Sequence, residues 1–443
     1  MHEVHKQNLT FQSLHRPLRY KFFNTLGSGL DAVGLSAIDL EIESLLEGAR
    51  KLTQLDDFGN QDFYVPLTYL IESLRTESQL NFVGKYLSKN MLTELLSERL
   101  RAQQYFQSFP EVFSEKIYKP LFVIGMPRSG TSFLFNLLCQ DPNSSWIKYW
   151  ELHTPSQHFF QGEKPDYAFA ENALIKKSSQ YLENTKRLMP QLDQVHSIDA
   201  VGPYECFHLL ERSFVCHTFG LYANVPTYIE WIESEYLKTD TQLPIDLYQY
   251  YYKQIQLIKN LRNWNDLGAQ ATSTELEKHW VFKSPVHLWS IDNISNTIPD
   301  AHFVHIHRDP LEVIPSICSF IALGRAVLSD QVDLENIGKQ ALKRWSEATA
   351  RALSIRQKDP SLKVIDIHYK RFVSDPVETI RNIYYQFDYN FTPELENSLR
   401  AYISKSRESK RGQQNKYSLE QFGLEEGEVR ERFHGYYQFM NSI

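Results

Sequence analysis

Cysteine is scarce in this chain and is never closely paired. The sequence has 443 residues and contains four cysteines, Cys139, Cys206, Cys216 and Cys318, of which no two form a C-x-x-C pair. This spacing argues against a zinc site built from cysteines and against a disulfide framework. The sequence therefore indicates a protein of a reducing compartment, and we expect a cytoplasmic location.

Long apolar runs and an excess of positive charge are also missing. No uncharged apolar stretch reaches the length needed to cross a bilayer, and residues 1–23 lack the apolar core of a signal peptide. We therefore expect no transmembrane segment, so that any membrane contact would be peripheral. The formal net charge is -7, which argues against a nucleic-acid-binding protein. A polyanionic ligand would have to be held by local charge.

Two kinds of hydrophobic pattern divide the chain. Segments 35–52 and 90–106 carry apolar residues at helical spacing with charges between them, which predicts a helical N-terminal extension over residues 1–115. The remainder, 116–443, alternates short apolar runs with helical patterns and has a helical insertion at about 155–275. The predicted strands are LFVIG (121–125), HWVFK (279–283), AHFVHIH (301–307) and LKVIDIH (362–368). This alternation is typical of an α/β domain with a parallel sheet.

GMPRSGTS (125–132), directly after the first predicted strand, is similar to a nucleotide-binding loop that lacks its lysine, although a turn rich in small residues by chance would look the same. The usual pattern is G-x-x-x-x-G-K-[ST], and Thr131 stands where the lysine is expected. Glycines at such a turn let the backbone approach an anion, and the following helix presents free N–H groups to it. Arg128 adds a permanent forked cation. The potential ligand groups lie at Arg128, Ser129, Gly130, Thr131 and Ser132.

A second candidate anion site follows a later strand. In HIHRDPLEVIPSICSF (305–320), Arg308 and Ser316 are separated by a turn and the start of a helix, so both could meet one anion. The same strand holds several histidines, but only His305 and His307 share a face of it. We therefore expect no metal site there.

Taken in order, these motifs resemble those of the sulfotransferases that use 3′-phosphoadenosine 5′-phosphosulfate (PAPS), in the bacterial-type branch with an Arg-Ser-Gly-Thr loop. The resemblance covers roughly residues 119–430 and also rests on VFKSPVHLWSID (281–292), PDAHFVHIHRDP (299–310), YKRFVSDP (369–376) and KYSLEQFGL (416–424). It implies a P-loop-like three-layer fold with a central parallel sheet, to which the helical N-terminal extension is added. It also implies a sulfotransferase that moves a sulfuryl group from PAPS to a hydroxyl or an amine of its acceptor, needs no metal and releases 3′,5′-ADP.

The resemblance assigns roles to individual residues. The loop from Arg128 to Ser132 is expected around the 5′-phosphosulfate. Arg308 and Ser316 are expected at the 3′-phosphate, together with Arg411 from the basic stretch 405–418. Arg128 and Lys283 are expected to act on the transferred group. The general base is either Glu151 or His196, with His153 as a third possibility.

Two other functions are open from the residues alone. The loop could belong to a small-molecule kinase, although the missing lysine argues against that chemistry. The chain could also be a non-catalytic nucleotide-binding scaffold that uses its helical N-terminus as an interaction surface. For the sulfotransferase, the Tyr- and Phe-rich region 204–252 fits an apolar or aromatic acceptor, either a small molecule or a lipid.

Overall fold

A parallel sheet lies at the centre of the molecule. The computed structural model describes residues 18–32, 38–153, 167–188, 198–236, 243–266, 278–409 and 417–443. Its five strands pair in parallel in the order β2-β3-β1-β4-β5. They are β1 (Leu121–Ile124), β2 (Ser144–Ser145), β3 (His279–Lys283), β4 (His302–His307) and β5 (Val364–His368). The four predicted strands are confirmed, whereas the two residues of β2 are too few to produce a pattern.

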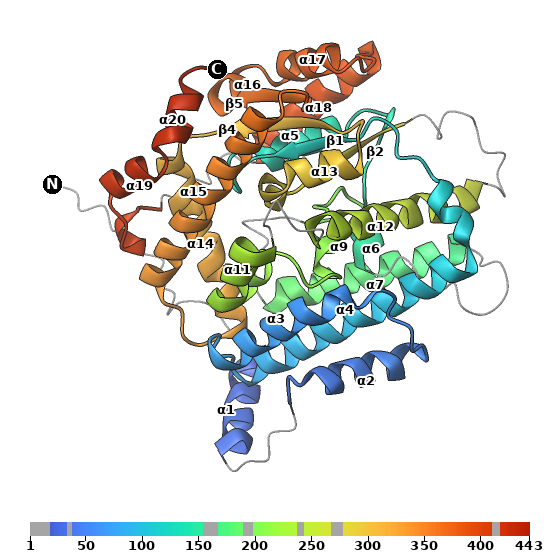
Figure 1. Ribbon diagram of the computed structural model, residues 1–443, viewed down its shortest axis with the longest axis vertical. Helices are drawn as coiled ribbons and strands as arrows, with labels where there is room; N and C mark the ends of the chain where they lie inside the picture. Colours follow the sequence, from blue (N-terminus) through green and yellow to red (C-terminus); the bar gives the residue numbers. More distant parts are fainter. Residues whose placement is uncertain are drawn as a thin grey trace.

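Helices cover both faces of this sheet, as the dense apolar strands require. One face packs on α5 (Thr131–Leu138), α17 (Pro376–Gln386) and α18 (Pro393–Ser409). The other face packs on α12 (Leu243–Asp266), α13 (Ile291–Thr297), α14 (Pro310–Leu328) and α15 (Leu334–Lys358). This confirms the three-layer α/β architecture. Figure 1 shows α17 and α18 above the sheet, and α12 and α13 below it.

The remaining elements extend or connect these layers. The N-terminal helices are α1 (Leu18–Ala32), α2 (Ile42–Thr53), α3 (Tyr64–Thr76) and α4 (Phe82–Ser108). The segment between β2 and β3 contains α6 (Tyr149–His153), α7 (Tyr167–Leu188), α9 (His208–Glu211), α10 (Phe219–Tyr222), α11 (Pro226–Trp231) and the π-helical turn η4 (Ile232–Tyr236). The C-terminal part adds α16 (Tyr369–Ser374), α19 (Glu426–Arg432) and α20 (His434–Met440). The 3-10 turns are η2 (Gln61–Phe63), η3 (Pro110–Ser114), η6 (Pro285–Trp289) and η7 (Glu420–Phe422).

The N-terminal helices share a hydrophobic core with the sheet domain. Leu45 on α2 and Leu92 on α4 belong to the same buried cluster as Phe122 on β1 and Ile317 on α14. Helix α4 starts where Asn81 caps it by accepting from the Gly84 N–H group at 2.8 Å. The expected helical character of this segment is confirmed, and its packing places α4 against α14.

Among the described residues, α14 is the one helix whose length and hydropathy would allow it to cross a membrane. Its apolar window is 72% buried inside the protein, because the helix packs against α4, α10 and α15. Burial in the fold therefore accounts for its apolar composition. The four cysteines are free and buried.

Candidate active site

The loop between β1 and α5 depends on two glycines. Gly125 has φ +144° and Gly130 has φ +102°, conformations that residues with a Cβ atom rarely adopt. A Cβ atom at Gly130 would lie 2.8 Å from the ring of Tyr369, and one at Gly125 would lie 2.6 Å from the Ile306 carbonyl oxygen. Arg128 also adopts a left-handed conformation, with φ 66°. The loop thus holds Arg128 in a backbone conformation of raised free energy, and such conformations occur most often at functional sites.

Two arginines, one in the loop after β1 and one directly after β4, meet here. The Arg128 Nε–H donates to Ser316 Oγ at 3.1 Å, and the Arg308 guanidinium donates to the carbonyl oxygen of Arg128 at 3.1 Å. Arg308 also lies over the ring of Tyr369, 4.2 Å from its centroid. Burial lowers the pKa of Arg128, and the nearby charge of Arg308 lowers it further, against the opposing effects of Tyr417 and Glu205. Arg308 also forms an ion pair with Glu312 at 2.9 Å, and the two arginines together place two permanent cations beside the loop, where they can hold an anion.

Lys283, the last residue of β3, reaches the same loop. Its ammonium group donates to Ser132 Oγ at 3.0 Å and forms an ion pair with Glu205. The Lys283 side chain is 3% exposed and that of Glu205 is 17% exposed. A buried ammonium held between the loop and a carboxylate is well placed to act on a group bound at the loop.

Glu151 lies apart from this cluster. Its carboxylate accepts from the Arg262 Nε–H at 2.7 Å, from the second Arg262 nitrogen at 2.6 Å and from the Lys148 N–H at 2.7 Å. It is 2% exposed and does not line the cavity at the loop. The structure thus gives Glu151 a fork of hydrogen bonds that holds α6 and α12 together. This geometry does not favour the role of general base.

The other predicted residues divide into three groups. Thr131 and Ser132 start α5 and line the cavity, as Arg308 does. Ser129 is fully buried and does not line the cavity. Its hydroxyl donates to the Met126 carbonyl oxygen at 2.6 Å and so stabilises the turn of the loop. His196 and Arg411 lie outside the described residues, as does the side chain of His153 at the end of α6.

Glu205 was not among the predicted residues. It lies in QVHSIDAVGPYEC (194–206), the stretch in which His196 is a candidate general base. Nothing in the local pattern links position 205 to a lysine 78 residues further along the chain. The ion pair exists because β3 and the segment before α9 pack beside each other in the fold.

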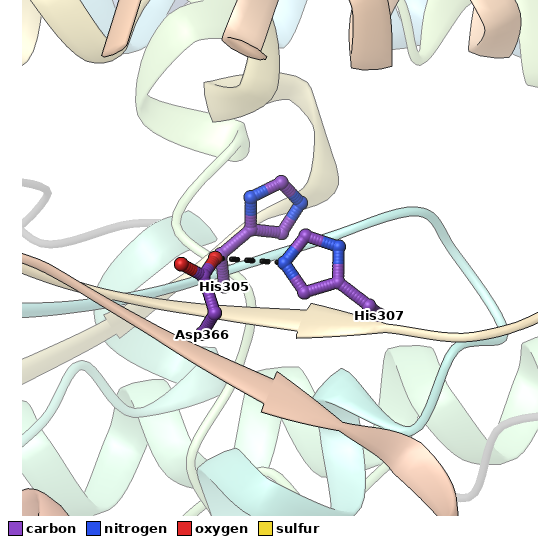
Figure 2. Close-up of side chains that lie close together, drawn as sticks. All are labelled: His305, His307 and Asp366. Atoms are coloured by element: carbon purple, nitrogen blue, oxygen red, sulfur yellow. Dashed lines mark hydrogen bonds and ion pairs between the residues drawn. The ribbon is translucent and has the colours of Figure 1, made fainter. Parts of the chain in front are cut away.

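A second polar cluster lies on β4 and β5, away from the loop. Figure 2 shows His305 and His307 on one strand and Asp366 on its neighbour. The potential ligand atoms of the three side chains lie within 4.8 Å of one another. The carboxylate of Asp366 accepts from His307 at 2.8 Å and from both Arg356 nitrogens, at 2.8 and 2.6 Å. Arg356 thus already supplies the positive charge that a metal ion would bring to this carboxylate. We assign the group to the packing of α15 on the sheet.

A large cavity joins the polar groups of the loop. Its volume is about 1370 Å³, above the roughly 300–1,000 Å³ of most small-molecule sites. Its wall includes Arg128, Ser132, Lys283, Arg308 and Glu205. These groups lie at or beyond the carboxyl ends of parallel strands, where ligands bind in open α/β sheets. The space is therefore large enough for a nucleotide and an acceptor together.

Comparison with known proteins identifies the family. A model of the sulfotransferase family matches residues 120–393, more than half of the chain. This chain belongs to the sulfotransferase family. The sulfotransferase superposes on the crystal structure of the sulfotransferase STF1 from Mycobacterium tuberculosis H37Rv with a TM-score of 0.73 and 28% identity, covering 89% of this chain and 98% of that one.

A second structural match supports the same fold. The sulfotransferase STF9 from Mycobacterium avium superposes with a TM-score of 0.75 and 22% identity, covering 91% of this chain and 97% of that one. No curated protein sequence matches the sulfotransferase significantly. The family match and the structures together show that this chain is a sulfotransferase enzyme with a bacterial-type fold.

Proposed function

We propose that this sulfotransferase moves a sulfuryl group from PAPS to a hydroxyl group of its acceptor and releases 3′,5′-ADP. The observation that carries the proposal is that Arg128 and Arg308 line one cavity together with Lys283 and Glu205, while Arg128 also donates to Ser316 behind the cavity wall. PAPS carries two anionic groups, and the loop and the Arg308 segment offer two adjacent sets of cationic and hydroxyl donors. The hydrogen bond from Arg128 to Ser316 suggests that Arg128 serves both sets.

In the proposed reaction, each of the groups at the cavity has a role. The acceptor oxygen attacks sulfur while the bond between sulfur and the bridging phosphate oxygen breaks, and the acceptor proton passes to Glu205. Lys283 and the N–H groups at the start of α5 stabilise the charge that builds up on the sulfuryl and bridging oxygens. Glu205 fits the role of base because it lines the cavity beside Lys283.

The nucleotide preference can be read from thermal unfolding. We expect 3′,5′-ADP to raise the melting temperature, because a ligand at 100 times its dissociation constant stabilises the folded state by about 2.7 kcal/mol. ATP with magnesium should leave the melting temperature unchanged, since the loop has no lysine for the β- and γ-phosphates. Transfer of labelled sulfate from PAPS to any component of a lipid or metabolite extract then tests catalysis. Stabilisation by ATP alone would contradict the proposal.

The assignment of the 3′-phosphate site predicts a selective loss. Arg308→Ala should weaken binding of 3′,5′-ADP far more than binding of 5′-AMP, since a lost charge-assisted hydrogen bond costs about 1.5–3 kcal/mol. Titration calorimetry with both nucleotides measures the difference. Arg381→Ala is the matched control, because Arg381 is paired with Glu378 and Glu396 on the surface. Equal losses for the two nucleotides would place the 3′-phosphate elsewhere.

A further inference from the structure

The cavity continues well beyond the groups that suit a nucleotide. Past Lys283 its wall is formed by α7, α14 and the N-terminal helix α4. Leu87 and Met91 on α4, Ile321 and Leu328 on α14, and Leu182 on α7 all line it. The rings of Tyr149 and Tyr204, with centroids 4.9 Å apart, stand at the start of this part, next to Glu205. We call the part lined by α4, α7 and α14 the apolar channel.

Two charged side chains beside the apolar channel, Arg212 and Glu211, are already matched within the protein, whereas Ser88 Oγ and Glu98 Oε2 on the α4 wall have no hydrogen-bond partner. Arg212 donates to Gln254 at 2.9 Å and to the Leu152 carbonyl oxygen at 2.5 Å. The carboxylate of Glu211 accepts from the Thr218 hydroxyl at 2.6 Å and lies 2.6 Å from the His208 Nδ1 atom. A ligand with many hydroxyl groups would have to compete with these contacts, and burying an unmatched polar group is costly. Because most of its lining consists of Leu, Ile, Val, Met and aromatic side chains, the channel favours an apolar ligand.

The cavity is also extended through the molecule. Ile403 on α18 lines it on the nucleotide side, and Leu52 on α2 lines it at the other end. Helices α18 and α2 lie on opposite sides of the protein (Figure 1). Leu52 is 59% exposed, and Asn90 and Glu94 beside it on the cavity wall are exposed as well, so this end forms a rim at the surface. A ligand with one polar end and a long body matches this form.

We infer that the acceptor is an alcohol with a long apolar body, whose hydroxyl lies at Glu205 and whose tail fills the apolar channel towards α2. The inference rests on the proposed function, because it takes Glu205 and Lys283 as the site of transfer. It gives the N-terminal helices a part in acceptor binding: α4 supplies one wall of the channel.

Binding of homologous alcohols tests the inference without any transfer. Protein saturated with 3′,5′-ADP is titrated by calorimetry with 1-butanol, 1-hexanol, 1-octanol and 1-decanol, and with maltose as a polar comparison. We expect affinity to rise about fourfold per methylene, which corresponds to ~0.8 kcal/mol per buried CH₂ group. Affinity that is independent of chain length, or maltose binding more tightly than 1-decanol, would overturn the inference.

A substitution locates the tail. Met91→Trp should fill the channel at α4, so that the rise in affinity stops at a shorter alcohol than in the unaltered protein. Tyr86→Trp is the matched control, because Tyr86 lies on the same helix, is 53% exposed and does not line the cavity. If affinity depended on alcohol chain length in the same way in both variants, the tail would not lie in the channel, and the assignment would be overturned.

The inference and the proposed function can fail separately. If long alcohols bind with the expected series but accept no sulfate from PAPS, the proposed function fails and the channel assignment stands. If sulfate passes from PAPS to polar acceptors while the alcohols do not bind, the channel assignment fails and the proposed function stands.

Discussion

Glu205→Gln should lower the turnover number about 10²- to 10⁴-fold, the range that general-base catalysis contributes. The amide keeps the size of the side chain and can still accept a hydrogen bond from Lys283, but it cannot take the acceptor's proton. Affinity for 3′,5′-ADP should stay nearly unchanged, since the base acts on the acceptor. Single-turnover kinetics with PAPS and calorimetry with 3′,5′-ADP measure the two effects.

A matched variant separates this role from a general disturbance of the cavity. Glu211→Gln also alters a carboxylate in the cavity wall, one that contacts His208 and Thr218. We expect a much smaller loss of turnover from it, because the partners of the Glu211 carboxylate are His208 and Thr218 and not the loop or Lys283. A steep loss from Glu211→Gln combined with normal turnover of Glu205→Gln would move the base to the pair of His208 and Glu211.

Mild acid should destabilise the folded chain strongly. Burial lowers the pKa of His287 to about 3 and holds the pKa values of His217 and His305 well below the usual 6.5. All three are fully enclosed in the core or nearly so. Their charged forms would lose hydration without a matching gain, so the folded state keeps them neutral.

The direction of the effect follows from proton binding. Because the folded pKa values are depressed, the unfolded chain binds more protons below pH 6.5, and stability falls as the pH drops through 6.5 towards the folded values. At pH 5.5 each such histidine lowers the free energy of unfolding by about 1.4 kcal/mol, and three by about 4 kcal/mol. Thermal unfolding between pH 7.5 and 5.5 measures the loss.

Two histidine variants test this origin. His287→Asn removes one buried histidine and should make stability fall less steeply with acid, by about one third of the three-histidine effect. His434→Gln changes an exposed histidine on α20 and should leave the dependence as it is. A pH dependence that His287→Asn does not alter would point to other groups.

Local sequence was enough to predict the scaffold of the site. Dense apolar runs such as LFVI and HFVHIH identify buried parallel strands, because every side chain in such a strand faces a layer of helices. The glycines of GMPRSGTS predict a turn of unusual backbone geometry, and Gly125 and Gly130 show it. The contact of Arg128 with the Arg308 segment was not predicted, because it depends on β1 and β4 being neighbours in the sheet.

Tertiary structure alone decided which carboxylate lies at the cavity. Glu151 and Glu205 are both glutamates downstream of the loop, and nothing local separates them. Arg262, 111 residues after Glu151, binds the Glu151 carboxylate away from the cavity. Lys283 forms an ion pair with Glu205, which lines the cavity. Likewise, hydrophobic periodicity predicts that α4 buries one face, but only packing against α14 turns that face into a wall of the cavity. Periodicity reports burial, whereas the partner of a buried side chain depends on contacts between segments far apart in the chain.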